Sequence, residues 1–381
     1  MLLNEDHIAV QDAVRAYVQD RIAPKAAEWD KTHEFPKDEL RGLAELGCYG
    51  VAVPTAYDGA GLGYLALAVI LEEIAAGDGA TSTIVSVNNC PVCSILMAWG
   101  SEAQKQLWLK PLARGDVLGA FCLTEPHAGS EAGGLKTTAV RDGDGYLING
   151  VKQFITSGKN GDVAIVMART SPNTGDKAAG KRGISAFIVP TSTRGYTVAR
   201  LEDKTGQHAS DTAQILFENC RVPAANLIGD EGQGLKIALS GLEGGRIGIA
   251  SQSVGMARAA FDAALAYSKQ RITFGKPIFE HQALQFRLAD MATEIEAARQ
   301  LIHHAASLKD AGRPCLKEAA MAKLCASEMA ERVCSAAIQI HGGYGYVSDF
   351  PVERIWRDVR VCQIYEGTSD VQRILIGRAL A

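Results

Sequence analysis

Hydrophobic positions recur along this chain with two different periods, and the period changes twice. Before about residue 118, apolar residues recur at spacings near three and four, as between Ile8 and Ile22, which is typical of one face of a helix. A second helix is expected from Pro36, with acidic residues in its first turn and a stop near Gly47. Further helices are expected over 62–77, 80–99 and 102–114, the last opening with a capping box at Ser101.

Short runs of β-forming residues replace this pattern between about 117 and 222. We expect strands at Leu118–Leu123, Lys136–Val140, Tyr146–Thr156, Val163–Ala168, Ile184–Val189, Tyr196–Ala199 and Ala213–Phe217. The run Asp142–Gly145 is typical of a hairpin turn, and Ser171–Arg182 is typical of a solvated loop. Strands with no helices between them predict a small antiparallel barrel or sandwich.

The helical period returns from about residue 231. Long helices are expected over 234–271, 280–311 and 316–340, and a last one after Thr368. Successive long helices favour a bundle. The sequence therefore predicts an α+β multidomain protein with an N-terminal α-helical domain (1–118), a middle antiparallel β-barrel domain (119–230) and a C-terminal four-helix bundle (231–381).

Composition narrows the function classes. The 381 residues are 47% hydrophobic and 22% charged, an ordinary globular balance, and the net charge of −4 comes without a basic stripe that would favour nucleic acid. The N-terminus does not resemble a secretory signal, and the longest apolar runs are far shorter than the roughly 20 residues that a membrane span needs. We therefore expect neither a signal peptide nor a membrane span. Nine cysteines without a regular framework favour reduced thiols, in a bacterial cytoplasm or a mitochondrial matrix.

Common catalytic machinery is missing from the sequence. It contains no P-loop motif, no H-E-x-x-H, and no G-x-G-x-x-G between a strand and a helix. Cys90 and Cys93 form a C-x-x-C without a second pair at zinc spacing, and the adjacent His303 and His304 face different sides of a helix. We therefore expect no metal site.

Four segments stand out together. They are Phe121–Ser130, where a strand runs into a turn, Phe154–Thr156 at the end of a strand, Gln339–Gly343 at the end of a long helix, and Tyr365–Ser369 before the last helix. Taken singly, each has an ordinary structural explanation, because a loop glutamate is usually solvated surface and paired glycines usually end a helix.

In this order and at these separations, the four segments resemble the acyl-CoA dehydrogenase family, and the resemblance covers essentially the whole chain. Leu242–Ala250, Arg271–Gly275, Gln282 and Tyr344–Tyr346 match it as well. The resemblance implies the same order of helical, sheet and helical domains, and FAD as the cofactor.

The resemblance also assigns cofactor-binding residues. Residues implied to contact the flavin are Phe121, Cys122, Leu123, Thr124, Ser130, Phe154, Ile155, Thr156, Thr368, Ser369 and Asp370. Residues implied to reach the FAD of a neighbouring subunit are Arg271, Phe274, Gln282, Gln339, Ile340, His341, Gly342 and Gly343.

Glu366 resembles the family's catalytic base. The α C–H beside a thioester is a weak acid, so a carboxylate can remove its proton only if hydrogen bonds stabilise the enolate character that develops on the thioester oxygen. The resemblance gives these donors as the main-chain N–H of Glu366 and a ribityl hydroxyl of FAD, with a hydride leaving the β-carbon for flavin N5. It gives the substrate contacts as Ser130, Glu243, Gly244, Gly245, Arg246, Tyr365 and Gly367.

The branch of the family and its partners follow from further positions. In other branches the base stands just before an arginine of the long helix, where this chain has Gly245 before Arg246. That segment and Ser86–Asn89 resemble the short-chain (butyryl-CoA) branch, with Ile84–Asn89 as the expected pocket floor. A short/branched-chain dehydrogenase, an acyl-CoA oxidase or flavin monooxygenase on the same scaffold, and a non-catalytic scaffold protein are the alternatives. The resemblance implies electron transfer flavoprotein as partner and a homotetramer built as a dimer of dimers.

Overall fold

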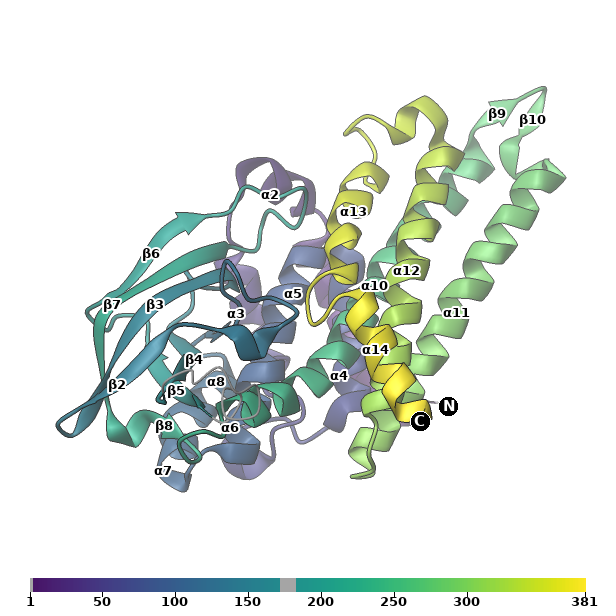
Figure 1. Cartoon of the computed structure of the whole chain (residues 1–381). Helices are drawn as coiled ribbons and strands as arrows, with labels where there is room; N and C mark the ends of the chain where they lie inside the picture. Colours follow the sequence, from purple (N-terminus) through teal and green to yellow (C-terminus); the bar gives the residue numbers. More distant parts are fainter. Residues whose placement is uncertain (1–2, 172–182) are drawn as a thin grey trace.

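A curled sheet stands at one side of the molecule and a bundle of long helices at the other (Figure 1). The computed structural model describes residues 3–171 and 183–381. Among these, the N-terminal helices are α1 (Glu5–Tyr17), α2 (Ala26–Thr32), α3 (Lys37–Glu45), α4 (Gly63–Gly77), α5 (Gly79–Val87), α6 (Ser94–Trp99), α7 (Glu102–Gln104) and α8 (Lys110–Arg114). The predicted capping box at Ser101 is confirmed, since its hydroxyl and the Gln104 side chain each accept the other residue's main-chain N–H.

The expected helix over 80–99 is wrong in one respect, because it is broken. Cys90, which precedes Pro91, has extended backbone angles (φ −141°, ψ 117°), and a π-helical segment (Asn88–Cys93) joins α5 to α6. The stretch Gly79–Trp99 is long and apolar enough by composition to span a membrane, contrary to the expectation from apolar runs alone. However, 83% of the 18-residue window that meets this criterion is buried inside the fold, so the stretch is explained as a core element.

The middle region is a sheet of β1 (Gly119–Cys122), β2 (Thr138–Asp142), β3 (Gly145–Thr156), β4 (Val163–Arg169), β5 (Ile184–Pro190), β6 (Tyr196–Leu201), β7 (Thr212–Pro223) and β8 (Leu227–Ile228). The predicted hairpin at Asp142–Gly145 is confirmed by the pairing of these two residues. The predicted loop Ser171–Arg182 falls, after Ser171, outside the described residues.

The prediction of an antiparallel barrel needs correction. β1 pairs parallel with β4, from Gly119 opposite Val163 to Cys122 opposite Val166. Hydrogen bonding follows an open path, β6-β7-β3-β2-β4-β5-β8, with β1 as a branch on β4. β1 takes this place because it arrives from the helical region and pairs with the edge that β4 offers, a long-range choice that strand periodicity does not encode.

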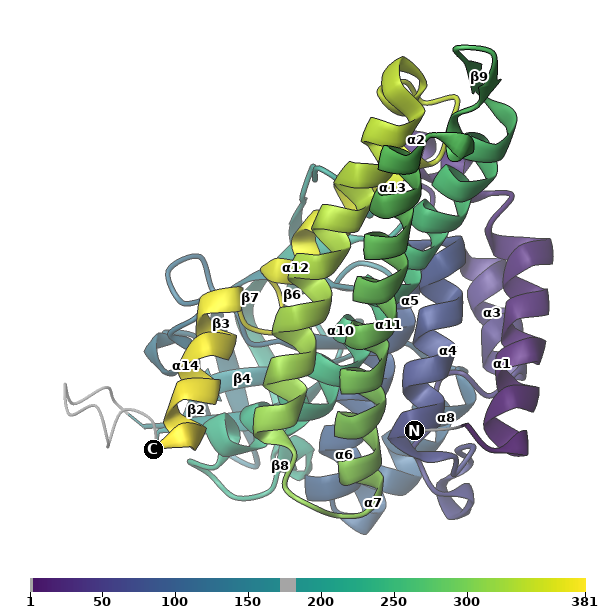
Figure 2. The same ribbon diagram turned by 90° about the vertical axis from the view of Figure 1, so that its right-hand side faces the viewer.

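The C-terminal region consists of α10 (Gly234–Gln270), α11 (Gln282–Asp310), α12 (Leu316–His341), α13 (Val352–Val359) and α14 (Ser369–Leu380), with the small hairpin β9 (Ile272–Thr273) and β10 (Lys276–Pro277). Figure 2 shows α10, α11 and α12 side by side, with α14 along one flank and α4 and α1 beyond the other. The long-helix predictions are confirmed, whereas α2, α13 and the β9–β10 hairpin were not predicted, because elements this short carry little periodic signal.

Apolar burial connects the regions. One cluster combines Val92 and Ile95 of the N-terminal region with Ile165 and Ile184 of the sheet and Ile237 of α10. The sheet therefore packs directly against the helices, and residues that are distant in sequence are held rigidly together where α10 passes between them.

Candidate active site

Glu366 lies on the bend between α13 and α14, and its carboxylate faces α10. Glu366 and Gly367 both have left-handed backbone angles, with φ of 55° and 89°. A Cβ added to Gly245 would lie 2.6 Å from Glu366 Oε2, so a side chain at position 245 would compete with the carboxylate for the same space. Within the described part of the chain, Oε2 is buried and has no hydrogen-bond partner. An unpartnered carboxylate oxygen of this kind is free to accept a proton.

Charge and burial around Glu366 oppose each other. Burial raises the pKa of Glu366 from 4.5 to about 7, while the positive charges of Arg246 and Lys323 lower it. Arg246 is 4% exposed, and its Nε and Nη1 have no partner among the described residues. A carboxyl group with a pKa near neutrality is a stronger base than an ordinary surface carboxylate.

The backbone of the bend is held from two helices. Lys323 Nζ, on α12, donates a hydrogen bond of 2.8 Å to the Gly367 carbonyl. Gln372 Nε2, on α14, donates to the carbonyls of Glu366 (3.1 Å) and Gly367 (2.8 Å). In contrast, the main-chain N–H of Glu366 donates to no acceptor in residues 3–171 and 183–381. The bend thus presents a carboxylate and an unused N–H from one rigid residue.

Tyr365, predicted as a substrate contact, uses its hydroxyl within the protein. The hydroxyl donates to Gln252 Oε1 at 2.7 Å and accepts from Gln207 Nε2 at 3.3 Å. Gln252 Nε2 in turn donates to the Gly79 carbonyl at 2.7 Å. These contacts join α10, the loop before β7 and the start of α5 to the bend, so the Tyr365 hydroxyl anchors Glu366 where the three regions meet.

Sequence reasoning missed these supporting residues. Lys323, Gln372, Gln252 and Gln207 are all buried polar side chains. For Lys323, the available signal was a polar residue in an otherwise apolar helical run, Ala319–Ala326. That signal indicates a buried polar contact without naming its partner.

Two glycines, one on either side of Gly245, permit close approach of α10 to the segment that contains Ser86 and Cys90. A Cβ at Gly244 would lie 2.8 Å from Cys90 Sγ, and one at Gly248 would lie 2.6 Å from Ser86 Oγ. Of the predicted pocket floor Ile84–Asn89, Ser86 therefore lies against α10, while the Asn89 side chain bonds to main-chain groups of Cys48, Val51 and Val85. The floor of an acyl pocket here is formed at most by part of the predicted run.

Glu243, another predicted substrate contact, has protein partners. Its Oε1 accepts from Lys309 Nζ at 2.8 Å and lies 3.4 Å from Cys315 Sγ. The Lys309 ammonium also lies 4.9 Å from the centre of the Tyr64 ring. The Glu243 carboxylate therefore links α10 to the end of α11 and the start of α12.

The two segments of the sheet predicted to contact the flavin lie together. Gln153 N–H donates to the Thr124 carbonyl at 2.8 Å, which joins β3 to the turn after β1. Phe154, at a register irregularity of β3, is left-handed (φ 59°) and 62% exposed. The side chains of Cys122 and Ile155 are buried in the sheet core, so these two positions offer a ligand only main-chain groups, as Leu123 largely does.

A buried ion pair supports this edge of the sheet. Lys152 Nζ, fully buried, donates to Glu125 Oε1 at 2.8 Å and to the Leu123 carbonyl at 3.0 Å. Glu125 also accepts the main-chain N–H groups of Lys136 and Thr137. The turn that carries Thr124 is therefore held in place by the buried Lys152–Glu125 pair. Ser130, six residues after Thr124, is exposed.

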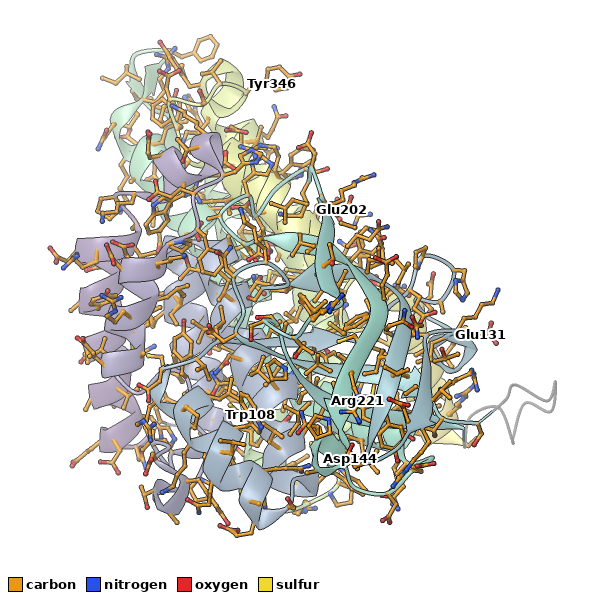
Figure 3. All side chains as sticks on the ribbon, turned by 90° about the vertical axis from the view of Figure 1, so that its left-hand side faces the viewer. Trp108, Glu131, Asp144, Glu202, Arg221 and Tyr346 are labelled. Atoms are coloured by element: carbon orange, nitrogen blue, oxygen red, sulfur yellow. The ribbon has the colours of Figure 1, made fainter. Side chains whose placement is uncertain are left out.

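The residues predicted to serve a neighbouring subunit lie at the far end of the bundle. The rings of Tyr267 and His341 stack at 4.4 Å, which places Gln339–Gly343 beside the end of α10 and Arg271. Phe274 is 96% exposed, and Tyr346 marks this end in Figure 3. Arg271 lies 26 positions after Gly245, which along an α-helix is about 39 Å. Arg271 is therefore too far from Glu366 to line the same site.

Local features of these segments fit a flavin dinucleotide. The buried Ser369 Oγ and His341 Nε2 lack partners within the described residues. A Cβ on Gly342 or Gly343 would meet nothing within 4 Å, so a ligand can approach the backbone there. Thr368 caps α14 by accepting the Val371 N–H, while Asp370 and Gln282 are exposed. Phe121 and Thr156 are half-buried.

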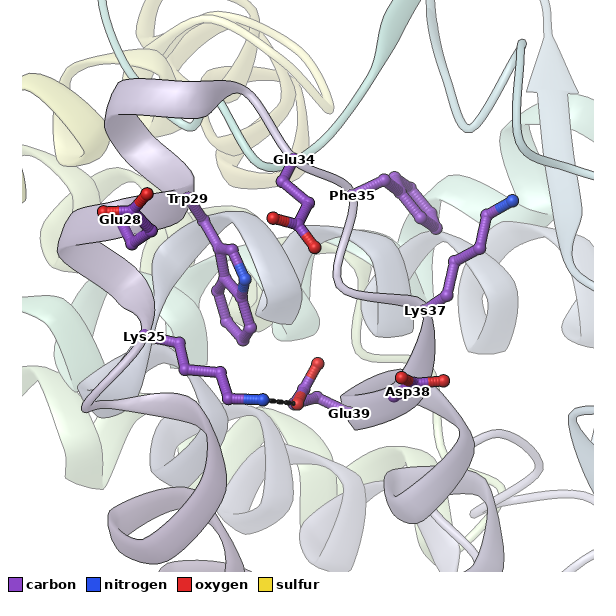
Figure 4. A pocket seen from close by; sticks show the side chains of 8 residues that line it. All are labelled: Lys25, Glu28, Trp29, Glu34, Phe35, Lys37, Asp38 and Glu39. Carbon is purple, nitrogen blue, oxygen red and sulfur yellow. Dashed lines mark hydrogen bonds and ion pairs between the residues drawn. The ribbon is translucent and has the colours of Figure 1, made fainter.

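A hollow of about 550 Å³ lies elsewhere, around α2 and α3 (Figure 4). Its walls include Trp29, Phe35 and a pair between Lys25 Nζ and Glu39 Oε1 at 2.5 Å. None of its lining residues belongs to the four segments, so it is not the place of the chemistry.

Comparison with known proteins identifies the family of this chain. The N-terminal, middle and C-terminal domain models of acyl-CoA dehydrogenase match residues 4–116, 120–220 and 232–381. The mitochondrial short-chain specific acyl-CoA dehydrogenase of Rattus norvegicus is 46% identical, over 98% of this chain and 90% of its own. Butyryl-CoA dehydrogenase from Megasphaera elsdenii has a TM-score of 0.97 at 41% identity, over 100% of this chain and 99% of its own. A chain in the structure described as the electron transferring flavoprotein of Acidaminococcus fermentans has a TM-score of 0.96 at 45% identity, over 100% of this chain and 99% of its own. The chain therefore belongs to the acyl-CoA dehydrogenase family, and it is an oxidoreductase that uses FAD.

Proposed function

We propose that the protein removes hydrogen from the α and β carbons of a short-chain acyl-CoA, giving the trans-2-enoyl-CoA, with Glu366 as the base that takes the α proton. One observation carries the proposal. Glu366 combines a buried carboxylate oxygen without a partner and a main-chain N–H without an acceptor, within the described residues. A proton acceptor and an oxyanion donor on one residue are what abstraction beside a thioester carbonyl requires.

The surrounding residues orient both groups. The left-handed bend is held by Lys323, Gln372 and the Tyr365 hydroxyl, so the carboxylate and the N–H keep a fixed relation to each other. Bound FAD supplies the acceptor for the hydrogen that leaves the β-carbon. The turn at Thr124, the exposed Phe154 and the N-terminus of α14 are the chain's own candidates for contacts to it.

The substrate is proposed to be a short acyl chain of about four to six carbons. The relatives named short-chain and butyryl-CoA dehydrogenase support this choice. The close packing of α10 against Cys90 and Ser86 at Gly244 and Gly248 is consistent with it. An added methylene meets repulsion in a closed pocket, so we expect kcat/KM to fall roughly tenfold at eight carbons. A maximum at 2-methylbutyryl-CoA or isobutyryl-CoA would instead select the branched-chain alternative.

The base is tested by Glu366→Gln. The amide is nearly isosteric, so the variant should fold and retain FAD while flavin reduction by butyryl-CoA slows at least about a thousandfold. Stopped-flow bleaching of the flavin measures this directly. Reduction by E366Q within tenfold of the wild-type rate would reject Glu366 as the base.

Assembly and electron exit complete the proposal. Because Arg271 lies about 39 Å along α10 from Gly245, we propose a homotetramer in which the end of each bundle completes a neighbour's FAD site. Arg271→Ala should then lower FAD retention without altering the base.

We propose electron transfer flavoprotein as the oxidant, which the similarity to a chain in the Acidaminococcus fermentans structure supports. Reoxidation equally fast in air alone would favour an oxidase.

A further inference from the structure

Lys323 is a buried lysine that contacts no carboxylate directly within residues 3–171 and 183–381. Its side chain is fully buried in α12, and the hydrogen bond recorded for its ammonium goes to the Gly367 carbonyl at 2.8 Å. A buried ammonium that bonds a neutral carbonyl instead of an anion costs stability, because its charge is only partly compensated. An apolar residue of similar length would fill this position at a lower cost. The position therefore has a use other than packing.

The location of Lys323 indicates that use. Gly367 directly follows Glu366, and both residues have left-handed backbone angles that a free loop would rarely keep. Gln372 bonds the same Gly367 carbonyl and also the Glu366 carbonyl. Two donors from two helices therefore converge on the two peptide groups that directly follow Glu366, and they fix the backbone on that side of the Glu366 side chain.

We propose that Lys323 is a positioning residue for the base: its ammonium holds the Glu366–Gly367 backbone in place and supplies a positive charge near the carboxylate. Burial lowers the pKa of Lys323 to about 8, so the ammonium carries this charge at neutral pH and below. This inference rests on the proposed function of Glu366. The other charged and titratable groups around the carboxylate are Arg246 on α10, the Cys90 thiol before α6 and, more distantly, Glu243. Arg246 gives the second positive charge, but it makes no hydrogen bond to the bend among the described residues.

Two variants separate the two effects. Lys323→Met removes both the charge and the hydrogen bond, whereas Gln372→Leu removes hydrogen bonds from the same carbonyls without changing charge. We expect both variants to slow flavin reduction by butyryl-CoA about tenfold or more with KM changed less than about threefold, because a displaced base loses rate more than affinity. Only Lys323→Met should move the acid limb of the pH–rate profile, to higher pH by about one unit, because a nearby cation favours the carboxylate form.

The experiment uses the FAD-loaded protein, with Lys317→Met as the matched control, since Lys317 lies on the same helix with its side chain 38% exposed. Infrared difference spectra of wild type against E366Q, repeated in the Lys323→Met background, give the protonation of Glu366 without relying on turnover. If Lys323→Met fails to fold, Lys323→Gln provides the same comparison.

The outcomes distinguish the two proposals. A wild-type rate and an unmoved acid limb in a folded Lys323 variant would overturn the inference while leaving Glu366 as the base. An active E366Q would instead overturn the proposed base itself, whatever the behaviour of Lys323. A shift of the acid limb in Lys323→Met but not in Gln372→Leu or Lys317→Met supports the inference.

Discussion

Gly245→Ala tests how closely α10 and the base are fitted to each other. The new Cβ would lie 2.6 Å from Glu366 Oε2, 2.8 Å from Cδ and 3.1 Å from Oε1. Ordinary van der Waals contact is about 3.5 Å, so the carboxylate must retreat by roughly 1 Å. The clash is with the end of a flexible side chain and not with backbone, so the fold can absorb it by moving Glu366 alone.

The expected loss is therefore in rate and not in stability. A misplacement of about 1 Å can cost about a hundredfold in rate, so flavin reduction should slow by that order. Alanine is more favourable than glycine inside a helix by about 0.5–1 kcal/mol, which offsets the strain of moving the carboxylate. The melting temperature and FAD content of the variant should stay close to those of wild type.

The assay is stopped-flow reduction with butyryl-CoA, alongside thermal unfolding. Gly377→Ala is the matched control, since Gly377 is also inside a helix, α14, and its added Cβ meets nothing within 4 Å. It should stabilise slightly and leave the rate unchanged. Flavin reduction by a folded Gly245→Ala protein at the wild-type rate would refute the placement of the carboxylate against α10.

Three further outcomes are expected. Because the pKa of Glu366 is raised to about 7, the rate of flavin reduction should fall as pH drops below 7. The folded state also binds the Glu366 proton more tightly than the unfolded state does, so Glu366 should lower the free energy of unfolding as pH rises from 4.5 to 7. If the melting temperatures of E366Q and wild type changed in parallel with pH across that window, this expectation would be contradicted. Lys152→Met should lower the free energy of unfolding, measured by chemical denaturation, by about 3–5 kcal/mol, because the Glu125 carboxylate would be left buried without its cation. Adding Glu125→Gln should restore part of this free energy. Equal stability of the single and double variants would argue against the ion pair. Tyr365→Phe should lower the free energy of unfolding by about 1–3 kcal/mol, because it leaves Gln252 Oε1 without its donor. It should slow flavin reduction far less than E366Q does. An equal loss of that rate would show that the Tyr365 hydroxyl takes part in the chemistry.

The sequence by itself determined the order of the three regions and most of their elements. The long helices α10, α11 and α12 carry enough turns for their period to be clear, and the hairpin at Asp142–Gly145 has local turn chemistry that needs no tertiary partner. It also indicated Glu366, through motifs in a fixed order.

Only the tertiary structure decided how the base is held. The parallel pairing of β1 with β4 depends on residues far apart in the chain. The break at Cys90 coincides instead with a local feature, the following Pro91, and the short helices α2 and α13 have too few turns to show a period. Lys323, Gln252 and Gln207 are buried polar residues, and nothing in their local sequence says that the first bonds Gly367 while the other two meet at Tyr365. Hydrogen bonds between residues 44 to 158 positions apart arise from packing. Periodicity identifies which faces are buried, but packing determines which buried polar groups meet.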